Sequence, residues 1–245
     1  MSGTASDRRH RLEAIAPGYD PSNPDEHFDY WLKRLQVETV TGRIRGERAI
    51  ELGCATGELT ALLAPSFERY TVVEGVASNI EQAERRCPSV EFVHSLWEDF
   101  RPLDATFSDA ILFNAVEHVE RPVELMHLAA SWLAPGGLLH IVVPNGLSLH
   151  RLVGVEMGLQ PDPLTLTEAD LAQGHMRNYT LDGILADVRS AGLHVTDWKG
   201  IFLKVLANRQ MLSWEWPLIH ALHAVAQRLP EHAAELYVCA SPVPC

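Results

Sequence analysis

Short apolar segments alternate with amphipathic segments along most of the chain. Apolar runs predict buried strands at residues 48–52, 70–74, 90–93, 109–114 and 138–143. Segments with helical periodicity lie between them, at 58–64, 78–86 and 122–133. Strands that are apolar throughout are typical of a parallel sheet with helices on both faces. The alternation therefore predicts a doubly wound α/β fold with a mostly parallel sheet.

The two ends of the chain extend this pattern. Residues 1–24 are polar and rich in proline and glycine, which predicts a flexible N-terminal arm, and apolar residues recur at helical spacing over 25–43. After the fifth strand the pattern predicts a cap or acceptor loop at 146–179, a helix at 180–191, a strand at 194–206, a helical insert at 208–230 with its helix at 210–228, and a last strand at 235–241. We expect one domain over residues 1–245.

Composition restricts the partners. Hydrophobic residues make up 47% and charged residues 21% of the 245 residues, which fits a globular domain with a full core. The formal net charge of −12 argues against a nucleic-acid or anionic membrane partner, because both require clustered Lys and Arg. The stretch from Leu125 to His150 lacks charged residues, but Pro-Gly and Pro-Asn-Gly turns interrupt it, so it does not predict a membrane helix.

The four cysteines lack the close spacing of a zinc site, and no His-x-x-x-His pair or similar ligand cluster appears. A chain of this length with four cysteines is not a disulfide scaffold, so we expect reduced cysteines, a cytoplasmic location and no metal.

A glycine-bearing turn follows the first predicted strand, in Glu51-Leu-Gly-Cys-Ala-Thr-Gly57. Gly53 and Gly57 leave room where a ligand approaches the backbone, and the following helix offers free N–H groups. The spacing Gly-x-x-x-Gly differs from the Gly-x-Gly-x-x-Gly of dinucleotide sites and from a P-loop. Glu74 closes the second strand, where a carboxylate meets the ribose of a nucleoside lying across the sheet.

Four segments together resemble the class I S-adenosylmethionine-dependent methyltransferases, over roughly residues 25–205. They are Glu51 to Gly57, Val73-Glu-Gly-Val-Ala-Ser-Asn-Ile80, Phe107-Ser-Asp-Ala-Ile-Leu-Phe-Asn-Ala-Val-Glu-His-Val119 and Leu133-Ala-Pro-Gly-Gly-Leu138. The chain looks similar to the small-molecule enzymes of the ubiquinone-biosynthesis type. The resemblance implies a seven-stranded Rossmann-like methyltransferase sheet in the order 3-2-1-4-5-7-6, with its last strand antiparallel, an N-terminal helix and a small helical cap.

The resemblance also implies how the donor would bind. Gly53 would contact the methionine part, Glu51 its amino group, and Glu74 the ribose hydroxyls. Further donor contacts are expected at Cys54, Gly57, Gly75, Leu96, Trp97, Asn114 and, if the arm folds over the site, Tyr19. Leu96 stands where the family has an acid for the adenine amino group, and whether Glu98 or Asp99 replaces that acid stays open.

Methyl transfer requires alignment, exclusion of water and, for a hydroxyl or ammonium acceptor, a general base. His118 is one candidate, and the alternative is a structural role near the donor. In the segment Gly174-His-Met-Arg-Asn-Tyr179, alternate residues would share one side of an extended chain. His175 could then act as the base, with Arg177 and Tyr179 on the acceptor, unless the segment only leads into the next helix.

These features predict a methyltransferase acting on an oxygen or nitrogen of a small-molecule metabolite, and natural-product biosynthesis is one setting that fits. The Asn-Pro-Pro-Tyr sequence typical of nucleic-acid amino-methylation is absent. Two alternatives remain: an NAD-dependent oxidoreductase on a Rossmann-like fold, and a catalytically inactive nucleoside-binding regulator. A homodimer is one option for the oligomeric state.

Overall fold

A seven-stranded sheet forms the centre of the computed structural model, which describes residues 21–104 and 106–243. Its strands are β1 (Arg48–Leu52), β2 (Arg69–Glu74), β3 (Glu91–His94), β4 (Phe107–Phe113), β5 (Leu133–Pro144), β6 (Leu193–Ile201) and β7 (Glu235–Pro242). The order is β3-β2-β1-β4-β5-β7-β6, with parallel pairing from β3 to β5 and β7 antiparallel to both β5 and β6. The predicted fold class, strand order and antiparallel last strand are confirmed. Tyr19 lies outside the described residues.

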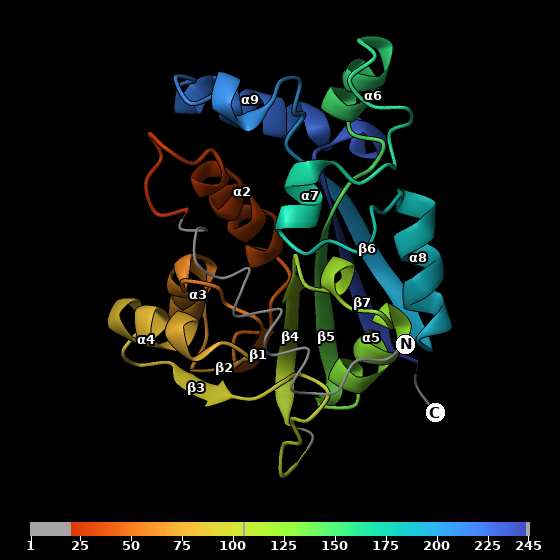
Figure 1. Ribbon diagram of the computed structural model, residues 1–245. Helices are drawn as coiled ribbons and strands as arrows, with labels where there is room; N and C mark the ends of the chain where they lie inside the picture. The colour runs from red at the N-terminus through yellow and green to blue at the C-terminus, as the bar shows by residue number, and fades with distance from the viewer. Residues whose placement is uncertain (1–20, 105, 244–245) are drawn as a thin grey trace.

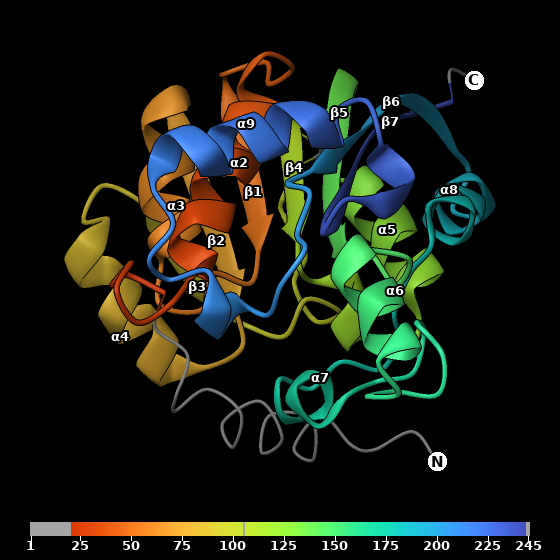
Figure 2. The ribbon, with the colours of Figure 1, turned by 90° about the horizontal axis from the view of Figure 1, so that it is seen from above.

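Helices cover both faces of the sheet and its carboxyl end. They are α2 (Asp29–Thr41), α3 (Glu58–Leu63), α4 (Ala77–Arg86), α5 (Pro122–Ala130), α6 (Leu149–Glu156), α7 (Glu168–Ala172), α8 (Leu181–Ser190) and α9 (Trp216–Ala226). Figure 1 shows α6, α7 and α9 toward the same end of the sheet, and Figure 2 shows α9 crossing over α2, with α7 on the opposite side of the molecule. The helices α6 and α7 belong to the segment 146–179, where the sequence predicted a cap.

Alternating side chains divide the core into two layers. Ile50 and Leu52 point toward the layer with α5 and α8, whereas Ala49 points toward the layer with α2, α3 and α9. This period of two follows from strand geometry. The same alternation places Glu51, a buried acid, on the α2–α3 side together with Thr60 of α3.

Two elements begin five or six residues from their predicted starts, whereas the other shifts are smaller. The strand β5 starts at Leu133, five residues early, because the chain pairs with β4 at Phe107, before the register shifts between Phe107 and Asp109. The helix α9 starts at Trp216 and is shorter than predicted, with Pro217 in its first turn, where proline fits best. Trp216 packs on Trp31 of α2 at a ring-centroid distance of 5.2 Å.

A buried polar chain connects three neighbouring strands. The carboxylate of Asp109 on β4 lies 2.9 Å from His140 Nε2 on β5, and His140 Nδ1 lies 2.8 Å from the Tyr237 hydroxyl on β7. Burial opposes both charges, but the hydrogen bonds to each side chain and the opposite charge of its partner together outweigh it. The pKa of Asp109 is therefore lowered and that of His140 is raised. The pair therefore favours its ionised form.

The described part of the chain contains no helix with the length and hydrophobicity that a membrane crossing would need. Cys54, Cys87 and Cys239 are free thiols and are buried.

Candidate active site

A cavity of about 2440 Å³ opens at the carboxyl ends of the parallel strands. This is where open α/β sheets bind ligands. Of the predicted site residues, those that line it are Glu51, Gly53, Cys54, Glu74, Gly75, Leu96, Trp97, Asn114, His118 and His175. Gly57, Arg177 and Tyr179 do not line it.

Glu74 is held at the turn after β1 by two backbone donors. The Cys54 N–H donates to its Oε2 at 3.1 Å, and the Val76 N–H donates to its Oε1 at 2.8 Å. Burial raises the pKa of Glu74, although these N–H groups partly offset the effect. The carboxylate is therefore fixed in orientation at the cavity wall, with lone pairs left for a ligand.

Glu51 has one satisfied and one unsatisfied oxygen. Its Oε2 accepts a hydrogen bond from the Thr60 hydroxyl at 2.7 Å, whereas its buried Oε1 has no partner among the described residues. Burial raises the pKa of Glu51 to about 7, although the Thr60 hydrogen bond and the nearby Lys33 charge favour ionisation. A buried acceptor without a donor is costly, and a cationic ligand group would satisfy it.

The two glycines of the turn make room for protein atoms. Gly53 has φ +81°, and a Cβ there would approach the Trp97 ring to 2.8 Å. Gly57 has φ +84°, and a Cβ there would meet Ala83 of α4 at 2.8 Å. The expectation that both glycines clear space for a ligand needs correction, because Gly57 instead allows α3 and α4 to pack closely.

Asn114, at the end of β4, connects the cavity wall to a polar cluster that the sequence interpretation missed. It has φ +52°, which is uncommon for a residue with a side chain and occurs often at functional sites. Its Oδ1 accepts hydrogen bonds from Lys33 Nζ at 3.1 Å and from Gln36 Nε2 at 3.0 Å, and Gln36 also donates to buried Glu235 at 2.9 Å. The sequence did contain one sign of this cluster, because Gln36 is a polar residue on the apolar face of α2.

The two predicted histidines meet at the other end of the cavity. The rings of His118 and His175 lie edge to face with centroids 4.8 Å apart. A backbone hydrogen bond of 2.9 Å from the Met176 N–H to the Glu117 carbonyl fastens the cap segment to the turn after β4. This bond explains how residues so distant in sequence become neighbours.

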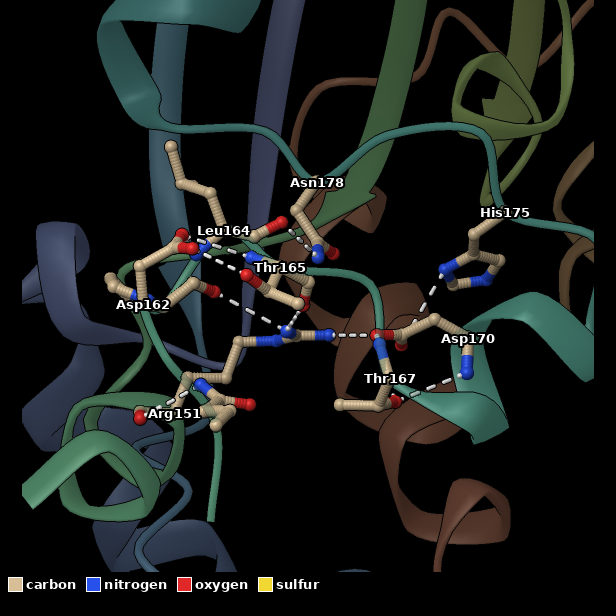
Figure 3. Close-up of polar contacts among 10 residues, drawn as sticks. Arg151, Asp162, Leu164, Thr165, Thr167, Asp170, His175 and Asn178 are labelled. Atoms are coloured by element: carbon tan, nitrogen blue, oxygen red, sulfur yellow. Dashed lines mark hydrogen bonds and ion pairs between the residues drawn. The ribbon is translucent and has the colours of Figure 1, made fainter. Parts of the chain in front are cut away.

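Asp170 faces His175 from α7 (Figure 3). Its Oδ1 lies 3.8 Å from His175 Nδ1, and its Oδ2 accepts hydrogen bonds from the Thr167 N–H at 2.8 Å and from Arg151 at 2.5 Å. Burial opposes ionisation of Asp170, but these donors outweigh it and lower its pKa. Burial also lowers the pKa of His175, so the imidazole is neutral at pH 7 beside a fixed carboxylate.

Arg177 and Tyr179 lie away from the position that alternation predicted. The Arg177 guanidinium donates to the carbonyls of Val119 and Glu120 at 2.7 and 3.2 Å. Tyr179 is buried in the core, donates through its hydroxyl to Asp187 at 3.1 Å, and forms a parallel bridge with Asn145. These contacts with protein groups indicate structural roles for both side chains.

The methyltransferase-domain family matches residues 10–197 of the chain. A trans-aconitate 2-methyltransferase of Rhizobium leguminosarum is 30% identical over 124 residues, which are 47% of this chain and 46% of that protein. One of Methylobacterium nodulans is 29% identical over 176 residues, 68% of this chain and 66% of that protein. The matches thus span about half to two thirds of these curated relatives.

A solved structure with the same fold is that of the N-methyltransferase NodS from Bradyrhizobium japonicum, in complex with S-adenosyl-L-homocysteine. The two superpose with a TM-score of 0.61, covering 96% of this chain and 98% of NodS, at 14% identity. At 14% identity, the superposition shows that the two proteins share a fold and nothing more.

Proposed function

The chain belongs to the class I S-adenosylmethionine-dependent methyltransferases, and from this premise we propose that it methylates an oxygen or nitrogen of a small-molecule metabolite. The observation that carries the proposal is that one cavity joins two groups of polar side chains. Its one end presents Glu51 and Glu74, and its other end presents the paired histidines His118 and His175.

The first end suits S-adenosylmethionine. The unpartnered Oε1 of Glu51 would accept the donor's amino group, and Glu74 would accept the ribose hydroxyls. Leu96 would pack on the adenine, and of the two acids left open by the sequence, Glu98 lines the cavity and Asp99 does not. Bound there, the donor supplies a methyl group already activated by a positively charged sulfur.

The second end suits the acceptor. With its proton on Nδ1 toward Asp170, His175 has the Nε2 lone pair free to take a proton from an acceptor hydroxyl or ammonium. The Asp170 carboxylate lies 3.8 Å from this Nδ1 and would stabilise the protonated ring, and His118 lies beside it as the second candidate. The protein otherwise aligns the two reactants and keeps water out.

The mouth of the cavity indicates an acceptor with an apolar body. Exposed apolar side chains of the cap line it, namely Val153, Met157, Leu159, Leu171 and Met176. An apolar wall beside polar reacting groups is typical of small-molecule sites. We infer a specialised metabolite, for which natural-product biosynthesis is a fitting setting, and the net charge of −12 argues against nucleic acid. The ubiquinone-type subgroup, the cytoplasmic location and the homodimer remain predictions.

Calorimetry with S-adenosylmethionine, S-adenosylhomocysteine and NAD tests the proposal. We expect micromolar dissociation constants, about −8 kcal/mol, for the first two ligands and none for NAD. Binding of NAD alone would support the oxidoreductase instead. Full donor affinity without turnover on a broad panel of hydroxyl and amine acceptors would support the inactive regulator.

Replacing Glu74 by alanine should weaken S-adenosylhomocysteine binding at least tenfold, because the two ribose hydroxyls lose a charged acceptor. Calorimetry measures the change. The affinity of the Glu74→Gln variant should lie between those of the wild type and Glu74→Ala, because glutamine keeps one oxygen near the Cys54 and Val76 N–H groups. Glu124→Ala is the matched control, since Glu124 lines the same cavity but pairs with Arg121 at its exposed rim. Equal affinity of the Glu74→Ala variant and the wild type would remove the ribose assignment.

Donor affinity should depend on pH through Glu51. Its carboxyl, with a pKa of about 7, must be ionised to accept an ammonium, so it has to lose a proton when the ligand binds at low pH. The affinity for S-adenosylhomocysteine should therefore rise about tenfold from pH 6 to pH 8. Glu51→Gln should bind more weakly at pH 8 and lose the pH dependence; a variant that kept the wild-type profile would contradict the assignment.

A further inference from the structure

Three side chains form a cluster at the acceptor end of the cavity: Glu117, His118 and His175. One ligand-type atom from each lies within 4.8 Å of the other two. Glu117 and His118 occupy one 3-10 turn, Val116–His118, and converge, with Glu117 Oε1 3.9 Å from His118 Nε2. His175 reaches them from the cap segment that the Met176 N–H fastens to the Glu117 carbonyl.

The cluster has unused bonding capacity. Glu117 is fully buried, and neither of its carboxylate oxygens has a hydrogen-bond partner among the described residues. His175 Nδ1 also lacks one, because Asp170 is 3.8 Å away, too far for a hydrogen bond. A buried carboxylate left this way is costly and requires either a proton or a cation.

We propose that Glu117, His118 and His175 bind a divalent transition-metal ion of the zinc class. Two imidazoles and one carboxylate form a known ligand set for such an ion. Ligand atoms on a tetrahedral zinc ion lie about 3.3 Å apart, so the three side chains would close by about an ångström. His118 and His175 line the cavity, which leaves a coordination position open toward it.

The surroundings of both imidazoles support metal binding. Both imidazoles are largely withdrawn from solvent, with side-chain exposures of 26% for His118 and 8% for His175. The Asp170 carboxylate lies 3.8 Å from His175 Nδ1 and places a negative charge beside the cluster. A nearby negative charge favours a bound cation.

The site has a consequence that rests on the proposed function. A bound cation occupies the lone pairs that proton abstraction needs, so the ion and the base proposed above exclude each other. An oxygen of the acceptor would then fit the open coordination position.

Zinc binding to the full chain, treated with a chelator and then dialysed, tests the proposal. Calorimetry with Zn²⁺ should show one tight site per chain, and Co²⁺ should give the visible absorption of a tetrahedral nitrogen–oxygen site. Glu117→Gln, His118→Gln and His175→Gln should each weaken zinc binding at least tenfold. His220→Gln is the matched control, because it removes an exposed histidine that also lies beside a glutamate, Glu38, at 2.9 Å.

The same samples are titrated with S-adenosylhomocysteine. Variants that bind it like the wild type are folded, so a loss of zinc binding in them supports the site. Wild-type protein that binds S-adenosylhomocysteine but no zinc, or cluster variants that all retain zinc, would overturn the metal site and leave the methyltransferase proposal intact. Zinc binding without S-adenosylhomocysteine binding would overturn the proposed function alone.

Discussion

In the metal-free protein, replacing His175 by alanine should lower methyl transfer by about 100-fold or more, while the affinity for S-adenosylhomocysteine changes less than twofold. A positioned general base typically contributes a factor of this size. His175 lies on the cap segment between α7 and α8, whereas the proposed donor ligands Glu51 and Glu74 lie on β1 and β2, so we expect donor binding not to depend on His175. Turnover is measured on an acceptor identified from the panel.

Added imidazole provides the second measurement. It should restore part of the activity of His175→Ala, because alanine leaves a gap beside Asp170 that a free base can enter. A purely structural histidine would not be rescued in this way. His220→Ala is the control, because His220 lies on the exposed side of α9. If the His175→Ala variant kept the turnover of the wild type, His175 would not be the base.

Replacing His140 by alanine should lower the free energy of unfolding by about 3–5 kcal/mol. The change leaves the buried Asp109 without its cationic partner, although the Arg45 N–H and the Ser108 hydroxyl still donate to it. Removing one partner of a buried pair costs about this much. The side chains of both residues are fully buried. For a chain of this length, the melting temperature should fall by about 6–20 °C, measured by calorimetry or circular dichroism.

His194→Ala is the control for this change, because His194 is exposed on β6. It should alter the melting temperature by no more than about 2 °C. If His140→Ala were as stable as the control, the hydrogen-bonded chain Asp109–His140–Tyr237 would not contribute to the free energy of unfolding.

The sheet could be predicted from the sequence because each strand carries its own signal. The first strand was expected at Arg48–Leu52 and lies there, since it is bounded by a polar segment and by a glycine turn. The start of β5 could not be read from the apolar run, because Pro135, Gly136 and Gly137 are typical of a turn. Leu133 pairs with Phe107 on the neighbouring strand, and this pairing extends β5 across the three turn residues. A pattern within residues 133–144 alone does not reveal such a pairing.

The two ends of the cavity differ in how far they could be predicted. Glu51 and Glu74 stand at strand ends, and strand ends in such a sheet meet at one edge. The burial of Glu117 depends on the cap resting on it, so no local pattern distinguished it from a solvated acid. Arg177 and Tyr179 were placed by assuming a regular extended segment, but hydrogen bonds at Val119, Glu120 and Asp187 decide their directions.

The fastening of the cap to the turn after β4 sets an order of events. His118 lies on the turn and His175 on the cap, and they adjoin while Met176 and Arg177 bond to the carbonyls of that turn. Any movement that lifts the cap to admit an acceptor separates the two histidines. On the proposed function, loading would thus take the reactive centre apart and closure would rebuild it, so the methyl group would be exposed to a base only when the acceptor has replaced water.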